Sequence, residues 1–286
     1  MIVNGKNILR VFPTKTRATP DDVDAYFDDP PALLLPEADE VHVSCLFSWD
    51  KPKAERLAEE WGQYYPIVKV GGPAYDAFGG EFIPGLYLRH GYTITSRGCP
   101  NNCGFCMVTR REGAAMRLLP IRDGWILQDN NILACPDAHV QKVFEMLAKQ
   151  PEPIRLLGGI EAGRLTDWHV NLIAGIRRRL RWLFTAYDEP DDREAVGDAI
   201  TRLRNAGLSH GQVHCFVLCG RGDDAPSQAY ARCQWVFDIG GVPFPSFFLP
   251  RSAEKREVPK EWKAMLAEWA TDRIIFARNK RERTIA

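Results

Sequence analysis

Short apolar runs alternate with helix-like patterns along the chain from Gly91 onward. Such alternation is typical of successive βα units, in which helices join parallel strands. Six runs are expected to form strands: 92–96, 125–128, 154–157, 180–184, 212–218 and 244–249. The pattern therefore predicts an α/β fold with a parallel sheet between residues 91 and 250.

Four of the segments between these runs carry apolar stripes at helical spacing. The stripes are Val140, Val143, Phe144 and Leu147; Val170, Ile173 and Ile176; Ala195, Val196, Ala199, Ile200 and Leu203; and Ala229, Cys233, Val236 and Phe237. Thr166 is the expected N-cap of the second helix, and Gly207 is expected just beyond the end of the third. After the first strand, Gly113 and Pro120 interrupt the segment, so we expect a short helix or none there.

Residues 1–90 predict a smaller βαβ extension. The run 41–47 alternates like a strand, a helix opened by Asp50 and Pro52 follows, and 66–73 reads as a second strand ending in a turn. Residues 251–286 predict a C-terminal helix that closes the open edge of the sheet, with apolar residues at Trp262, Met265, Leu266 and Trp269. A basic tail follows, with Arg273, Arg278, Lys280, Arg281 and Arg283.

The charges balance, with 37 Lys and Arg against 37 Asp and Glu, so no global field draws the protein to nucleic acid or membrane. The first residues are too polar for a signal peptide, and no apolar stretch is long enough to span a bilayer. Eight cysteines without a secretory signal favour metal ligation in a reducing compartment over disulfides. We therefore expect a cytoplasmic protein that is not bound to a membrane.

Three of the cysteines, Cys99, Cys103 and Cys106, lie in one loop with the spacing C-x3-C-x2-C, and Phe105 precedes the third. Thiolates are the usual ligands of iron–sulfur clusters, and three of them leave one iron of a [4Fe-4S] cube open. An open coordination position is typical of a catalytic metal centre. The alternatives are a chance cluster of thiols and a zinc knot. A zinc knot needs a fourth ligand, and no paired C-x2-C unit follows.

This spacing, with an aromatic residue at Phe105, resembles the signature of the radical S-adenosylmethionine (SAM) superfamily. The resemblance implies that SAM chelates the open iron and that the reduced cluster cleaves it to methionine and a 5′-deoxyadenosyl radical. It also implies an external electron donor, flavodoxin-like or ferredoxin-like. For residues 91–250 it implies a partial (β/α)6 barrel. The substrate is not identified by the sequence.

The resemblance also indicates which residues hold SAM, because chemistry in such barrels lies where the strands end and the βα loops converge. Phe105 is expected beside the adenine. The remaining candidates follow the second, third, fourth and fifth strands: Asp129, Asn130 and Asn131; Glu161 and Arg164; Tyr187; and Gly220. Each has a structural alternative, since Asp and Asn are common in capped turns and Glu161 and Arg164 can form a local ion pair.

The N-terminal extension resembles a truncated form of the cobalamin-binding domain that precedes many radical SAM barrels. The D-x-H-x-x-G motif that ligates cobalt there is missing, and His42 lies within the first predicted strand of the extension. Cobalamin is therefore not expected as a cofactor.

Two other readings concern the remaining cysteines and the basic residues. Four cysteines outside the loop are dispersed over separate elements, so an auxiliary cluster is not favoured: Cys135, Cys215, Cys219 and Cys233.

The first functional alternative is modification of a base in RNA or DNA. Phosphate contacts would come from the basic tail and from the basic run of Arg177, Arg178, Arg179 and Arg181. A non-catalytic iron–sulfur sensor is the second.

Overall fold

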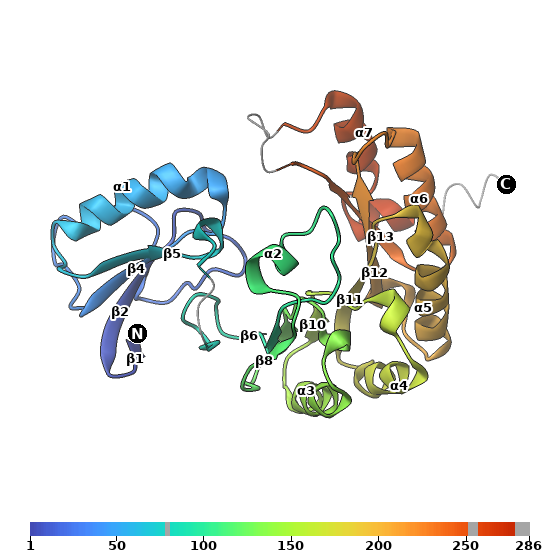
Figure 1. Ribbon diagram of the computed structural model, residues 1–286, viewed down its shortest axis with the longest axis horizontal. Helices are drawn as coiled ribbons and strands as arrows, with labels where there is room; N and C mark the ends of the chain where they lie inside the picture. Colours follow the sequence, from blue (N-terminus) through green and yellow to red (C-terminus); the bar gives the residue numbers. More distant parts are fainter. Residues whose placement is uncertain (78–80, 251–256, 278–286) are drawn as a thin grey trace.

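The computed structural model describes residues 1–77, 81–250 and 257–277 (Figure 1). Two larger sheets divide the chain, one near the N-terminus and one from Tyr92 to Phe247. Most of the predicted basic tail, from residue 278 onward, lies outside the described residues. Among the described residues, no helix has the length and apolar character needed to cross a membrane.

The second sheet has six strands that pair in the order β13-β12-β11-β10-β9-β6, and every pair is parallel. The strands are β6 (Tyr92–Thr93), β9 (Ile126–Leu127), β10 (Ile154–Leu156), β11 (Leu180–Tyr187), β12 (Val213–Cys219) and β13 (Val242–Phe247). Neighbours in the sheet are therefore neighbours in the sequence. The α/β class and the parallel sheet predicted from the alternating runs are confirmed.

Helices connect these strands and lie together on one side of the sheet (Figure 1). They are α3 (Asp137–Lys149), α4 (Asp167–Ile176), α5 (Arg193–Asn205) and α6 (Pro226–Asp238). The Thr166 hydroxyl accepts a hydrogen bond from the His169 amide, so Thr166 is the N-cap of α4 as predicted. Gly207 follows α5 with a φ of 91°, which only glycine adopts easily.

The two faces of this sheet differ because side chains alternate along each strand. On the helix side, Leu183, Val213 and Val217 belong to the main core. On the other side aromatic rings gather, and the rings of Phe184 and Phe216 stack at 4.6 Å. β13 forms one edge of the sheet, and its sequence contains two prolines, Pro243 and Pro245.

Between β6 and β9 the chain makes a short excursion. β7 (Ser96–Arg97) pairs antiparallel with β8 (Arg117–Leu118), and α2 (Val108–Glu112) lies between them. The expected short first helix is confirmed, since α2 has only five residues and ends at Gly113. Gly98 has a φ of 91°, and a Cβ there would lie 2.3 Å from the Ala115 carbonyl oxygen, so the two arms of the excursion require glycine where they meet.

The N-terminal sheet has five strands in the order β1-β2-β4-β5, and β3 pairs with β2. They are β1 (Ile2–Val3), β2 (Lys6–Val11), β3 (Ala25–Tyr26), β4 (Glu40–Ser44) and β5 (Val68–Gly71), with helix α1 (Lys51–Gly62) between the last two. The predicted strand–helix–strand unit is therefore present. The first three strands were missed, because the central strand β2 carries a fully buried Arg10 that disguises its apolar pattern. Arg10 pairs with Asp22 and donates to the Gly85 carbonyl.

The C-terminal helix α7 (Lys260–Glu268) contacts α6 and β13. Trp262 packs on Phe247 with ring centroids 5.1 Å apart, and Trp269 packs on Tyr230 at 5.5 Å. The expected helix at the sheet edge is confirmed. Six short 3-10 turns complete the described elements: Ser48–Asp50, Pro73–Tyr75, Ile132–Ala134, Ala162–Arg164, Pro190–Asp192 and His210–Gln212.

The core of the N-terminal unit gives a stability prediction. Trp61 is fully buried and packs against Tyr26 and Tyr65, so Trp61→Ala should lower the free energy of unfolding by about 3–5 kcal/mol. Trp49 is 52% exposed, and Trp49→Ala should cost less than about 1 kcal/mol. Urea unfolding followed by circular dichroism measures both. Equal losses in the two variants would contradict this packing.

Candidate active site at the cysteine loop

The three cysteines of the C-x3-C-x2-C motif lie in the loop between β7 and α2, at the carboxyl edge of the six-stranded sheet. Cys99 and Cys106 are half-buried, Cys103 is exposed, and none forms a disulfide. Partial burial raises the pKa of the Cys103 thiol, and the neighbouring Cys106 and Cys99 raise it further. The thiols are therefore close enough to affect one another electrostatically.

Glu112, the last residue of α2, fixes both ends of the loop. Its Oε1 accepts from Arg97 Nη1 at 3.0 Å, and its Oε2 accepts from the Gly98 amide at 3.3 Å. Asn130 Nδ2 donates to the same Oε2 at 2.5 Å. Asn130 therefore supports α2, because its amide nitrogen is used by Glu112.

Asp129 supports the loop from beneath. Its carboxylate is buried and accepts from the Thr95 amide and hydroxyl, both at 2.6 Å, and from the Ser96 hydroxyl at 2.7 Å. His139 of α3 also hydrogen-bonds the Thr95 hydroxyl, at 3.1 Å. Burial raises the pKa of Asp129, although these donors act in the opposite direction. Asp129 therefore holds the start of the cysteine loop and does not face the rim.

Three of the predicted residues do meet beside the cysteines. Asn131 Nδ2 lies 3.6 Å from Cys99 Sγ and donates to Glu161 Oε2 at 2.6 Å. The same oxygen accepts from Arg164 Nε at 2.6 Å. Asn131 is only 4% exposed, and its Oδ1 has no hydrogen-bond partner among the described residues. A buried amide oxygen without a donor is unfavourable, so a bound group that donates to it would stabilise the site.

Two predicted residues lie elsewhere. Tyr187 is buried on the helix side of the sheet, with its ring edge-on to Trp235 of α6 at 5.3 Å. Gly220 has a φ of 73°, and a Cβ there would lie 2.1 Å from the Phe247 ring. The absence of a side chain at Gly220 is thus required by packing against Phe247. Neither residue lies with Asn131 and its partners.

Phe105 is held by a residue that sequence reasoning missed. The Arg221 guanidinium lies over the Phe105 ring, 5.4 Å from its centroid, and also pairs with Glu189. The cysteine loop is thereby connected to the loops after β12 and β11. The signal in the sequence is a lone arginine between Gly220 and Gly222, just after the fifth predicted strand.

Asp188, next to Tyr187 in the loop after β11, is a carboxylate that acts electrostatically on the cysteine loop. Its pKa is raised to about 6, mainly by burial. The negative charges of Asp192 and Glu189 raise it further. Its own charge in turn raises the pKa of Cys103. The backbone amides of Asp188 and Glu189 donate to Asp192 at 3.0 and 2.8 Å, which fixes this loop.

The cysteines outside the loop are all buried. Cys215, Cys219 and Cys233 are buried in the main core, and Cys135 is buried near Ser96. Burial is the main cause that raises the pKa of Cys219 to about 11, which disfavours the thiolate that a metal needs. Their dispersal over β12, α6 and the segment before α3 agrees with core packing.

A single metal ion and an iron–sulfur cube place different demands on the cysteine loop. Within residues 1–77, 81–250 and 257–277, no three His, Cys, Asp or Glu side chains gather closely enough to hold one metal ion. A zinc knot requires four ligands around one point, whereas a cube takes one thiolate at each of several irons. No protein-family model and no curated protein matches this sequence.

The raised pKa of Asp188 predicts a pH-dependent stability. Its carboxyl binds a proton more tightly in the folded than in the unfolded state, so ionised Asp188 costs stability above about pH 6. Asp188→Asn should therefore unfold less readily than the parent at about pH 8, by at most roughly 3 kcal/mol, and match it near pH 4. Exposed Asp191→Asn is the control, and urea unfolding of the metal-free protein is the measurement. A difference between parent and Asp188→Asn that does not change with pH would contradict this burial.

Proposed function

We propose that the protein is a radical SAM enzyme that acts on a small molecule. The observation that carries the proposal is the contact of Asn131 with both Cys99 and Glu161 at the carboxyl edge of the parallel sheet. It brings the cysteine loop together with polar groups from the loops after the second and third strands. We interpret the six consecutive parallel strands and their outer helices as a partial (β/α)6 barrel.

Cys99, Cys103 and Cys106 would hold a [4Fe-4S] cluster. When bound and reduced, a cluster with an open iron supplies the electron that cleaves SAM to methionine and a 5′-deoxyadenosyl radical. The Asn131 amide donates toward the Cys99 sulfur, and such hydrogen bonds orient a ligand and tune the potential of a cluster. Phe105, fixed under Arg221, would pack beside the adenine.

Glu161 and Arg164 are suited to the amino-acid part of SAM. Only Arg164 Nε is used within the described residues, so its two terminal nitrogens remain for a carboxylate, which an arginine binds with two parallel hydrogen bonds. Glu161 is 27% exposed at its side chain and would accept from the ammonium group. The unpartnered Asn131 Oδ1 would accept from the same ammonium group.

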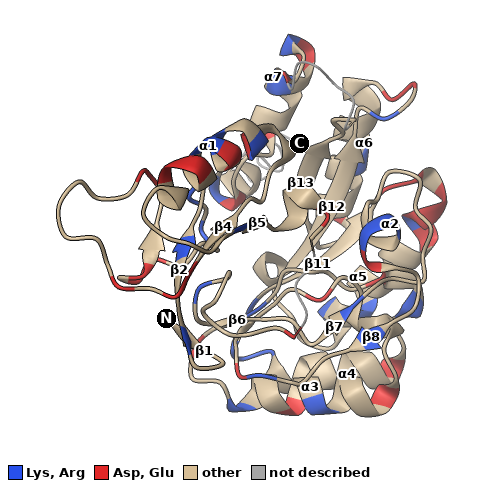
Figure 2. Ribbon diagram, turned by 60° about the vertical axis from the view of Figure 1, so that its left-hand side comes forward, with Lys and Arg blue, Asp and Glu red and all other residues tan. Residues whose placement is uncertain are grey.

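The nucleobase alternative is less well supported by the geometry. Arg177, Arg178, Arg179 and Arg181 lie where β11 begins, at the opposite edge of the sheet from the cysteine loop. Arg177 and Arg179 already donate to the carbonyls of Ala174 and Ala148. In Figure 2 acidic and basic residues are interspersed along α1 and α3, without a continuous basic stripe there. A phosphate backbone bound at this run would be far from the site of chemistry.

The proposed chemistry also sets the surroundings of the protein. A reduced cluster and eight cysteines without disulfides among the described residues suit the cytoplasm, with a flavodoxin-like or ferredoxin-like electron donor. Cobalamin is not part of the proposal. Both ring nitrogens of His42 are already engaged, Nδ1 with Tyr87 and Nε2 with Glu40, so neither is available to a cobalt ion.

The first test of the function is the iron content. Protein reconstituted anaerobically with iron and sulfide should bind about four irons, as one cube requires. Changing Cys99, Cys103 and Cys106 together to Ala should abolish this binding, whereas Cys45→Ala, a buried thiol of the N-terminal unit, should retain it. Iron is measured colorimetrically. Full iron in the triple variant would refute the cluster assignment, and about eight irons in the parent would indicate an auxiliary cluster.

The second test concerns SAM. A hydrogen bond to a charged group contributes about 1.5–3 kcal/mol, so Glu161→Ala should weaken SAM binding by roughly ten- to a hundredfold with its iron content intact. Glu194→Ala, an exposed carboxylate on α5, is the control. SAM affinity and the yield of 5′-deoxyadenosine are measured after reduction with dithionite. Formation of 5′-deoxyadenosine separates the enzyme from a non-catalytic sensor, and an unchanged affinity in Glu161→Ala would remove that residue from the site.

A further inference from the structure

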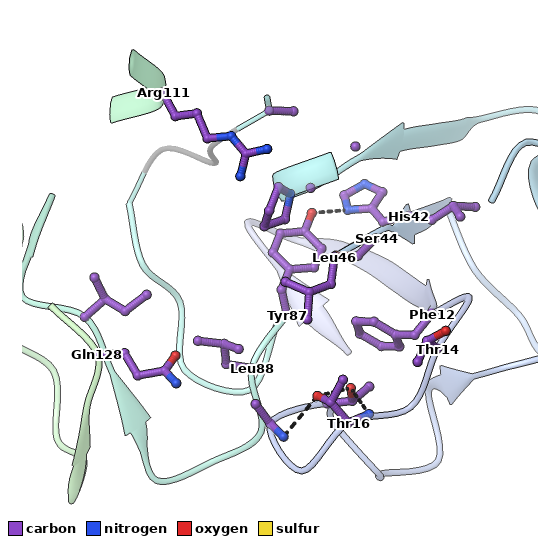
Figure 3. A pocket seen from close by; sticks show the side chains of 18 of the residues that line it. Phe12, Thr14, Thr16, His42, Ser44, Leu46, Tyr87, Leu88, Arg111 and Gln128 are labelled. Carbon is purple, nitrogen blue, oxygen red and sulfur yellow. Dashed lines mark hydrogen bonds between the residues drawn. The ribbon is translucent and has the colours of Figure 1, made fainter. Parts of the chain in front are cut away.

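A cavity of about 560 Å³ lies between the N-terminal sheet and the excursion that carries the cysteines (Figure 3). One wall follows the carboxyl ends of the parallel strands β2, β4 and β5, where ligands of open α/β sheets commonly bind. The other wall comes from residues around α2 and the ends of β6 and β9, including Met107, Glu112, Gln128 and Asn130. Met107 directly follows Cys106, so the cavity adjoins the candidate active site.

The lining favours an uncharged ligand. Its three cationic side chains are each paired within the protein: Lys69 with Glu40, Arg97 with Glu112 and Arg111 with Asp76. Much of the remaining wall is apolar, with Phe12, Leu46, Leu88, Ile94 and Val108 among its residues. A volume of this size is typical of sites for small organic molecules. A phosphate or a polynucleotide would find no unpaired cation among these lining residues.

One wall of the cavity carries a hydrogen-bonded series of three side chains. His42 Nε2 lies 2.9 Å from Glu40 Oε2, and His42 Nδ1 lies 2.7 Å from the Tyr87 hydroxyl (Figure 3). Glu40 also binds Lys6 and Lys69, and its pKa is held at about 2 by these partners, so it is an ionised acceptor. In its neutral form the His42 ring donates from Nε2 to this carboxylate, which leaves Nδ1 as an acceptor.

This order fixes the direction of the Tyr87 hydroxyl. Its proton is donated to Nδ1 of a neutral His42, so the lone pairs of its oxygen remain for a ligand of the cavity that Tyr87 lines. Burial and the charge of Glu40 raise the pKa of Tyr87, which keeps the hydroxyl protonated. A ligand that meets Tyr87 must therefore offer a hydrogen-bond donor and not an acceptor.

We propose that this cavity binds the substrate, an uncharged and largely apolar small molecule with a hydroxyl or N–H group, and that Tyr87, oriented by His42 and Glu40, selects for that donor. The identification of the ligand as the substrate rests on the proposed function, whereas the binding site and its selectivity do not.

The test uses two probes of similar shape, 1-naphthol and 1-methoxynaphthalene, of which only the first can donate a hydrogen bond. Full-length reconstituted protein is titrated calorimetrically under anaerobic conditions at one fixed, mildly alkaline pH. The parent should bind 1-naphthol about tenfold more tightly, because the methoxy oxygen leaves the Tyr87 oxygen without a donor. In Tyr87→Phe the two affinities should agree within about twofold.

Two further variants separate orientation from packing. Without His42, in His42→Ala, the Tyr87 proton is released toward the cavity, so the affinity for 1-methoxynaphthalene should rise by about fivefold. Tyr64→Phe removes the hydroxyl of an exposed ring outside the cavity and should retain the tenfold preference of the parent. Ser44→Trp, which fills the cavity, should abolish binding of both probes.

Failure of 1-naphthol to bind the parent would overturn the cavity as a site for this class of molecule. A preference for 1-naphthol that persists in Tyr87→Phe would overturn the role of Tyr87. Iron content and 5′-deoxyadenosine are measured on the same preparations. If the protein shows the probe preference but binds no iron, the proposed function is refuted and the binding site is retained. If it binds iron and forms 5′-deoxyadenosine but shows no probe preference, only the binding site is refuted.

Discussion

The buried carboxylate of Asp129 is the interaction on which the rest of the site depends. It fixes Thr95 and Ser96, from which the cysteine loop begins, and so joins the loops that follow the first two strands of the sheet. The segment after the third strand passes close to Asp129. A Cβ on Gly158 would lie only 1.9 Å from the Asp129 carbonyl oxygen. Because Gly158 passes so near, Glu161 three residues later reaches the Asn131 amide, next to Asp129 in the chain. The Asp129 side chain thus joins the first two loops and its backbone meets the third, and the burial of the carboxylate is balanced by the donors around it.

α2 serves two sides of the molecule despite its length of five residues. Toward the cysteines, the Val108 amide lies 3.5 Å from Cys106 Sγ. Toward the cavity, Glu112 holds Arg97 and Asn130, and all three line the wall that faces the N-terminal sheet. The N-terminal unit is therefore more than a scaffold, because the ends of its parallel strands complete a cavity that the six-stranded sheet would leave open.

The sequence was most informative where a repeating pattern decides the structure. Strand and helix periodicity predicted the parallel sheet and its outer helices, and cysteine spacing located the loop. The sequence-based prediction was wrong where the role of a residue depends on whether its side chain points into the core or toward the site. Tyr187 was expected at the rim, but the alternation of side chains along β11 points it toward α6. Asp129 was also expected at the rim, but its buried carboxylate accepts a hydrogen bond from Thr95. Strand β2 was missed because its Arg10 is buried and paired, and Arg221 was passed over because nothing local shows that a loop residue reaches Phe105.

The prolines of β13 have a consequence for assembly. The Phe248 amide donates to the Cys219 carbonyl of β12, so the even-numbered amides around it point into the sheet and the positions of Pro243 and Pro245 point outward. Neither proline carries an N–H, so the outer side of this strand cannot offer a continuous row of donors to a strand from another molecule. Edge strands of this kind resist the edge-to-edge pairing that leads to aggregation. With α7 packed beside it, this edge of the six-stranded sheet is therefore a poor template for a strand from a second molecule.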